Sequence, residues 1–297
     1  MTQLVQCIPN FSEGRNIEVI NRLKQIAEEA RGVTVLDVTS DEDHNRMSIA
    51  MLGAPDKIAE VAFSLVKYAT KHINMQEHSG AHPRMGATDV VPFVPVKNIS
   101  MEACIQLSKT FAERVSEELN VPTFLYEHSA SSAERKNLSH IRHGQFEKMA
   151  DKIKKDEWKP DYGEQRIHPT AGVTAVAARM PLVAFNVNLN TPNVEIAKSI
   201  AKIIRESNGG FKDCKAIGLK LAERHMTQVS MDIVNYEVIP LYRVLETIRM
   251  EARRYGVDVL GAEVYGIAPA QALIDSAAYY MQLEDFNAEK QVLENRV

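Results

Sequence analysis

The chain has 297 residues, which is long enough for two domains. Of these residues 45% are hydrophobic and 25% are charged, a composition typical of folded domains. The formal net charge of -4 argues against a general nucleic-acid binder. Apolar runs are too short to cross a bilayer, and the N-terminus enters a strand-like segment directly, so we expect no membrane span, no signal peptide and a cytoplasmic protein. Cys7, Cys104 and Cys214 are too scattered to form a disulfide framework, which fits a reducing compartment.

The first half of the chain alternates short β-branched runs with longer runs of helical periodicity. Gly32 follows the first predicted helix, and Pro55 begins the second, as these residues often do at helix ends. The predicted order is β-α-β-β-α-β, the ferredoxin-like arrangement. The predicted strands are 4–8, 33–38, 46–52 and 89–96, and the helices are 16–30 and 55–72.

The second half repeats this pattern after a long polar stretch. A helix at 100–119 and a strand at 123–126 lead into residues 127–167, where we expect a helix at 145–155 and a loop at 158–163. The strands that follow are predicted at 182–189, 214–219, 228–235 and 257–261, and the helices at 193–205, 241–255 and 269–283.

These patterns predict an α/β fold of the α+β type. We expect two subdomains, 1–180 and 181–297, each a ferredoxin-like layer of sheet and helices. A crevice between two such layers is a common place for a ligand.

The segment richest in reactive side chains is residues 77–89, EHSGAHPRMGATD, between a predicted helix and a predicted strand. Its glycines and proline indicate a fixed, irregular backbone. Histidine suits proton transfer because its unperturbed pKa is near neutral, so His78 and His82 are candidates. A surface loop whose side chains meet only water is the alternative.

His78 and His82 also have the i, i+4 spacing of a metal-binding pair on a helix. Gly80 and Pro83 argue against a helix there, and no third ligand is near in the sequence. We therefore expect no metal, and keep a metal hydrolase as an alternative.

Two further loops carry polar side chains. Residues 163–172 mix hydrogen-bonding groups with glycine and proline and are either a linker or a ligand-contacting loop. In residues 9–15, Asn10 and its neighbours are candidates for hydrogen bonds to a ligand, while Ser12 or Asn16 is a candidate helix N-cap.

These segments together resemble the formiminotransferase family. The opening CIPNFSEG is similar to the family's CVPNFSEG, and HPRMGA followed by Asp89 matches its HPRMGA-x-D signature. The strand NVNL at 186–189 resembles the family's FNxNL, and QVS at 228–230 resembles another recurrent stretch. The four matches occur in family order and span essentially the whole chain.

The resemblance implies an enzyme that transfers a formimino group from N-formimino-L-glutamate to tetrahydrofolate, a co-substrate, in a tunnel between the subdomains. It implies that His82 is the catalytic acid/base. Transfer of a one-carbon group between two amines needs no Lewis acid, so we expect no metal, and charge and hydropathy predict no nucleic-acid or membrane partner. The resemblance also implies a homodimer, and leaves open a separate cyclodeaminase, because animal relatives carry that domain fused. The resemblance assigns folate contacts to Gly163, Glu164, Gln165, Arg166, Ile167, His168, Pro169, Thr170, Ala171 and Gly172.

Both substrates carry carboxylates, for which Arg84 and Arg46 are candidate partners, since arginine binds a carboxylate with two parallel hydrogen bonds. Some relatives have Asp-Ala-Gly where this chain has residues 39–41. If an aspartate from that loop assists His82, it is Asp37, Asp41 or Asp43 here.

Three functions compete with this one. The first is another folate one-carbon enzyme, acting on formylglutamate or 5-formyltetrahydrofolate. The second is a folate-binding protein without catalysis, and the third is the metal hydrolase named above.

Overall fold

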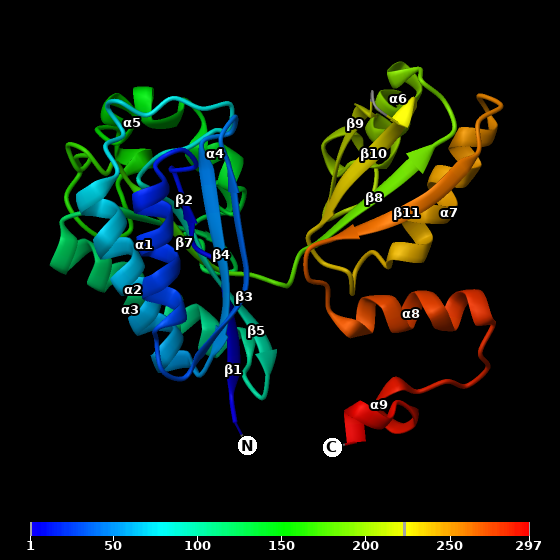
Figure 1. Cartoon of the computed structure of the whole chain (residues 1–297), viewed down its shortest axis with the longest axis horizontal. Coiled ribbons are helices and arrows are strands. Elements are labelled where there is room, and N and C mark those ends of the chain that lie inside the picture. The colour runs from blue at the N-terminus through cyan, green and yellow to red at the C-terminus, as the bar shows by residue number, and fades with distance from the viewer. Residues whose placement is uncertain (1, 222–223, 297) are drawn as a thin grey trace. The chain divides into compact units, whose positions relative to one another are not determined.

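The computed structural model describes residues 2–221 and 224–296 (Figure 1). The chain divides into two compact units between Arg179 and Met180. The termini of the predicted subdomains, residues 1 and 297, lie outside the described residues.

The first unit begins with the predicted ferredoxin-like order. The strands lie in the order β3-β4-β1/β2-β5, because β1 and β2 each pair with both β4 and β5. Residues alternate between buried and partly exposed along β4, which is the pattern of a strand with one covered face. The elements are β1 (Leu4–Cys7), β2 (Asn10–Phe11), α1 (Ile17–Glu28), β3 (Val33–Asp41), β4 (Arg46–Gly53), α2 (Pro55–His72) and β5 (Thr88–Lys97).

The N-cap of α1 is Asn16, whose side chain accepts hydrogen bonds from the backbone N–H groups of Glu18 and Val19. The hydroxyl of Ser12, the other candidate cap, instead donates to the carbonyl of Gly86 at 2.8 Å. This bond ties the loop after β2 to the loop before β5.

A parallel extension completes the sheet of the first unit. β7 pairs in parallel with both β5 and β6 and is buried along its whole length. The sequence patterns do not predict β7, because its sequence TAVAA is rich in alanine, which is depleted in strands. The extension comprises α3 (Met101–Leu119), β6 (Thr123–Glu127) and β7 (Thr174–Ala178).

Two layers cover this sheet. Helices α1, α2 and α3 pack against one face of the sheet and form one large apolar core with it (Figure 1). A smaller core, including Phe124, Ile141 and Met149, joins the parallel strands to the polar stretch that follows β6. That stretch forms the short elements η1 (Ala133–Arg135), α4 (Leu138–Arg142), α5 (Gln145–Lys152) and η2 (Asp156–Trp158).

The second unit is a ferredoxin-like layer with strand order β11-β8-β10-β9, all antiparallel. The predicted fold class is therefore confirmed for both units. β11 occupies Val259–Tyr265, later than the predicted 257–261. The other elements are β8 (Val183–Leu189), α6 (Val194–Ile204), η3 (Glu206–Asn208), β9 (Cys214–Leu221), β10 (Met226–Ile233), α7 (Leu241–Arg253), α8 (Ala270–Met281), α9 (Ala288–Gln291) and η5 (Leu293–Arg296).

Over the described residues, none of the helices combines the length and the apolar character that spanning a membrane requires.

Candidate active site

The loop between α2 and β5 packs closely against the chain that enters β7. A Cβ atom on Gly86 would lie 2.2 Å from the carbonyl oxygen of Val173, and one on Gly172 would lie 2.3 Å from that of Met85. Gly172 also has a φ of +69°, which disfavours other residues. Only glycine at both positions permits this approach, which holds the His82 loop against residues 171–173.

His82 is half-buried, and its Nδ1 atom has two competing neighbours. Nδ1 lies 2.6 Å from Nη1 of Arg46 and 2.6 Å from the carbonyl oxygen of Pro83. The Arg46 contact requires a lone pair on Nδ1, whereas the Pro83 contact requires a proton there. The neutral ring can therefore satisfy one of them at a time. Donating to Pro83 leaves Nε2 free to accept a proton, and accepting from Arg46 leaves the proton on Nε2.

Arg46 belongs to a buried charged cluster centred on Asp89. Arg46 donates to Oδ1 of Asn10 from Nε and Nη2, at 3.1 and 2.8 Å, and to Oδ2 of Asp89 at 3.2 Å. Arg142 donates to the same Asp89 oxygen at 2.7 Å. The other oxygen, Oδ1, accepts from the backbone N–H of Met85 at 2.9 Å. Two guanidinium groups thus share one carboxylate, so the cluster has an excess of positive charge.

Three neighbouring strands and a β-bulge bring this cluster together. Asn10 pairs with Ser48 in β4 and with Val90 in β5, while Phe11 pairs with Thr88. This register shift leaves Asp89 opposite no residue of β2. Bulges re-aim side chains, and this one accompanies the contact of Asp89 with Arg46.

The surroundings of His82 favour its neutral form. Burial lowers the pKa of the ring, the positive charges of Arg46 and Arg142 lower it further, and the opposing effects of Asp89 and the Pro83 carbonyl are smaller, so that the pKa falls to about 4. Burial also lowers the pKa of Arg46, against the attraction of Asp89. At neutral pH, the His82 ring is therefore uncharged.

This pKa can be checked without any assay of function. Titration of the His82 imidazole by ¹H–¹⁵N NMR should give a midpoint near pH 4. The substitution Arg46→Met should raise the midpoint, because a neighbouring positive charge is lost, but not to the ordinary value of about 6.5, because burial remains. Arg22→Met, at an exposed position of α1, is the matched control. A wild-type midpoint near 6.5 would contradict this electrostatic account.

Arg84 and His78 hold the loop from its other side. Nε of Arg84 donates to Nδ1 of His78 at 3.1 Å, while Nη1 and Nη2 bind both carboxylate oxygens of Glu147 at 2.9 and 2.5 Å. Nη1 and Nη2 also donate to Gln145 and to the carbonyl of His78. The side chain of Arg84 is only 8% exposed, so a substrate carboxylate would have to displace Glu147. Its role in substrate binding stays a prediction.

His78 is engaged through both ring nitrogens. Since Nδ1 accepts from Arg84, the proton lies on Nε2, which donates to the carbonyl of Asn45 at 3.0 Å. Burial is the main cause that lowers the pKa of this ring. In residues 2–221 and 224–296, no three His, Cys, Asp or Glu side chains gather in a way that could hold a metal ion.

The aspartates of the β3–β4 region have other surroundings. Asp41 accepts a hydrogen bond from the backbone N–H of His44 at 2.7 Å, and this bond lowers the pKa of the Asp41 carboxyl. The side chains of Asp37 and Asp43 are exposed. The carboxylate that reaches the cluster is Asp89, which the sequence patterns place in the reactive segment 77–89 and in the family signature without a partner. A charged residue beginning a strand as apolar as DVVPFV was the available signal. Arg142, which we missed, gives no such local signal.

The predicted folate-contacting segment lies partly beside the His82 loop. The backbone of His168 and Gly172 forms two reciprocal hydrogen bonds, of 2.9 and 3.0 Å. The carbonyls of Thr170 and Ala171 accept from Met75 and Ala87, at 2.8 and 2.9 Å. At the other end of the segment, Glu164 and Arg166 form an exposed ion pair.

Comparison with known proteins gives a consistent result. Two family models match, "Formiminotransferase domain, N-terminal subdomain" over residues 4–179 and "Formiminotransferase domain" over residues 184–295. The chain is 58% identical to a glutamate formimidoyltransferase of Streptococcus pyogenes serotype M1, covering 100% of this chain and 99% of that protein. It is 42% identical to a glutamate formimidoyltransferase of Thermoplasma acidophilum, covering 99% and 97%. It is 40% identical to the formimidoyltransferase-cyclodeaminase of Rattus norvegicus, covering 96% of this chain and 53% of that protein.

Proposed function

The chain belongs to the formiminotransferase family, and from that premise we propose that it transfers the formimino group of N-formimino-L-glutamate to tetrahydrofolate. The products are 5-formimidoyltetrahydrofolate and L-glutamate, and the reaction is a step of histidine degradation. The observation that carries this proposal is the 58% identity, over the full length of both chains, to an enzyme named for this activity.

Proton transfer is assigned to His82. N5 of tetrahydrofolate attacks the amidine carbon of the donor, a C–N bond forms, and the N5 proton passes to Nε2 of His82. The same proton then passes to the glutamate nitrogen as the second C–N bond breaks, so the histidine ends as it began. The tautomer that donates from Nδ1 to the Pro83 carbonyl is the one that can do this, since it leaves Nε2 free.

Substrate binding prepares His82 for this role. With a pKa of about 4, the free imidazole is a weak base. A substrate carboxylate placed near Arg46 and Arg142 would offset their excess positive charge and raise the pKa of His82 toward the operating pH. Arg142 has more N–H donors left for a substrate than Arg46 has. In the described parts of the chain, the one side chain to which Arg142 donates is Asp89.

The other proposed contacts follow the family and the chemistry of the substrates. We assign Arg46, Arg84 and Asn10 to substrate binding and residues 163–172 to folate binding. Tetrahydrofolate is a co-substrate in this scheme, in which no step calls for a metal. We place the subdomain limits at 1–180 and 181–297.

The assembly and location of the protein are also proposals. We propose a homodimer, and a cyclodeaminase partner that receives the product, because the relative from Rattus norvegicus is named for both activities. A cytoplasmic location is supported by Cys7, Cys104 and Cys214, which are free thiols.

A turnover assay tests the proposed activity. Purified protein is given tetrahydrofolate with either N-formimino-L-glutamate or N-formyl-L-glutamate, and formation of the 5-substituted folate is followed. We expect turnover with the formimino donor and much slower turnover with the formyl donor. Faster turnover with N-formyl-L-glutamate would assign the chain to another folate one-carbon reaction. Folate binding without turnover from either donor would leave a non-catalytic binding protein.

A further inference from the structure

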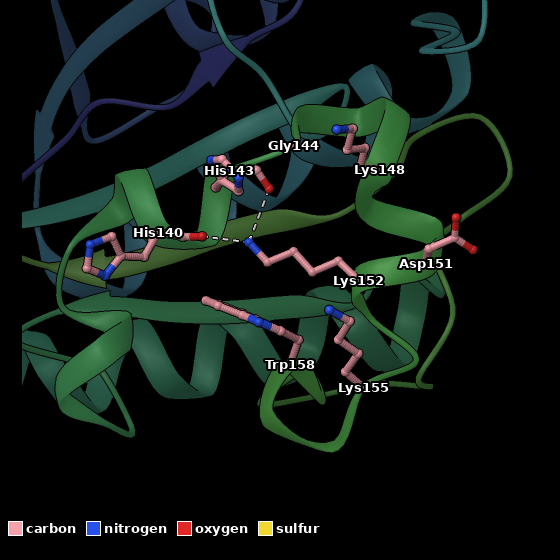
Figure 2. Close-up of a pocket in the computed structure, with 8 residues that line it drawn as sticks. All are labelled: His140, His143, Gly144, Lys148, Asp151, Lys152, Lys155 and Trp158. Atoms are coloured by element: carbon pink, nitrogen blue, oxygen red, sulfur yellow. Dashed lines mark hydrogen bonds between the residues drawn. The ribbon is translucent and has the colours of Figure 1, made fainter.

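A cavity of about 570 Å³ opens beside α4, α5 and η2 in the first unit (Figure 2). This volume is within the range of small-molecule sites, about 300–1,000 Å³. None of its lining residues is among the site residues proposed above. The side chains that define it chemically are His140, His143, Lys148, Lys152, Lys155 and Trp158.

Lys152 forms a fixed part of the wall. Its Nζ donates to the carbonyls of His140 and His143 at 2.5 and 3.2 Å, and to a third carbonyl, that of Ile141, at 2.8 Å. It also lies 3.8 Å from the centre of the Trp158 ring. Burial lowers the pKa of Lys152 to about 8, and the neighbouring charge of Lys155 contributes to the shift.

Two other lysines flank Lys152 and are free. The side chains of Lys148 and Lys155 are exposed, and in the described part of the chain neither amine pairs with a carboxylate. The one carboxylate lining the cavity, Asp151, pairs with Lys154 at 3.1 Å. Figure 2 shows the amines of Lys148 and Lys155 above and below Lys152 in this view. The cavity therefore has more positive than negative charge.

The spacing of these lysines favours a ligand with two anionic groups. Positions 148 and 152 are four residues apart and share a face of α5, whereas Lys155 lies beyond the end of that helix, in an extended conformation just before η2. The two exposed lysines therefore approach the cavity from different elements, and Figure 2 draws their amines on opposite sides of Lys152. A single small anion cannot contact both amines unless the lysines fold back toward each other, whereas a linear dicarboxylate can reach both.

We propose that this cavity binds a small organic dicarboxylate, with one carboxylate at Lys148, the other at Lys155, and the carbon chain over the indole of Trp158. The inference does not depend on the proposed transferase activity. The site adjoins the catalytic cluster along the chain, because His143 lines the cavity and the preceding residue, Arg142, binds Asp89.

The sequence provides a selective probe of this site, because Trp158 is the only tryptophan in the chain. Intrinsic tryptophan fluorescence of the full-length protein is titrated with glutarate, adipate and suberate, and with inorganic phosphate. We expect a saturable change with the dicarboxylates, strongest for the chain length that spans the two amines, and a weaker response to phosphate. The affinity should fall with added salt, because ion pairs at exposed lysines are screened.

Substitutions identify the contacts. Lys148→Gln combined with Lys155→Gln should weaken dicarboxylate binding about tenfold, as expected for the loss of two partly exposed ion pairs. Lys67→Gln, at an exposed position of α2 outside the cavity lining, is the matched control and should bind normally. Circular dichroism checks that both variants are folded. The proposal is overturned if no dicarboxylate gives a saturable change, if phosphate binds as tightly, or if the folded double variant binds as well as the wild type.

Discussion

The substitution His82→Ala is expected to lower kcat by about 10²–10⁴-fold, the usual contribution of a general acid/base residue. The ring is half-buried beside Arg46 and the Pro83 carbonyl, while Asp89, the carboxylate of the cluster, already accepts hydrogen bonds from two guanidinium groups and a backbone N–H. Folate affinity should change little, because in the proposed mechanism the imidazole transfers a proton and does not bind the co-substrate. Steady-state kinetics and equilibrium folate binding measure the two effects separately.

The control for this substitution is His72→Ala. His72 is exposed at the end of α2, where its ring stacks on Tyr68 at 4.1 Å between centroids. Removing it deletes an imidazole without touching the charged cluster, so kcat should stay near the wild-type value. Turnover of His82→Ala close to that of the wild type would refute the assignment of His82, even if the transferase activity itself were established.

The substitution Asp89→Asn should have the largest effect on stability. Asp89 is fully buried, at 0% exposure. Its carboxylate accepts hydrogen bonds from Arg46, Arg142 and the backbone N–H of Met85. Asparagine keeps the shape but loses the charge, which leaves two partly buried guanidinium groups without their counter-ion. Breaking a buried ion pair by removing one partner costs about 3–5 kcal/mol. Urea unfolding, monitored by circular dichroism, measures the change in the free energy of unfolding.

A double-mutant cycle with Arg142→Gln tests the cause of that loss. If excess positive charge destabilises Asp89→Asn, then removing one of the two arginines should recover part of the lost free energy of unfolding. Simple addition of the two single-variant effects would show that Asp89 and Arg142 are not coupled. A loss below about 0.5 kcal/mol for Asp89→Asn alone, as is usual for surface substitutions, would show that the buried charge matters little.

Residues 142–145 connect the Asp89 cluster to the cavity beside α5. Arg142 ends α4, Gly144 follows with a φ of +87°, and α5 begins at Gln145, where Arg84 is bound. A ligand in the cavity would therefore lie on a short segment that is anchored to the His82 loop at both ends. This arrangement gives the segment two connections to the His82 loop, through Asp89 and through Arg84.

The sequence by itself determined the order of most elements, because the alternation of buried residues along β4 and the helical periodicity of α1 and α2 are local patterns. It also determined the family, through motifs whose residues are contiguous, and the choice of His82 follows from that resemblance. Local patterns failed for β7, whose burial depends on the two strands beside it rather than on its own alanine-rich sequence.

Only the tertiary structure decided which charged groups meet. Arg46 and Arg142 reach Asp89 across 43 and 53 residues of sequence, and a β-bulge accompanies the placement of Asp89 beside them. The same is true of Arg84, whose partner Glu147 is 63 residues away. Periodicity fixes the face on which a side chain lies, but a charge is neutralised or left free by whichever groups the fold brings within about 3 Å of it.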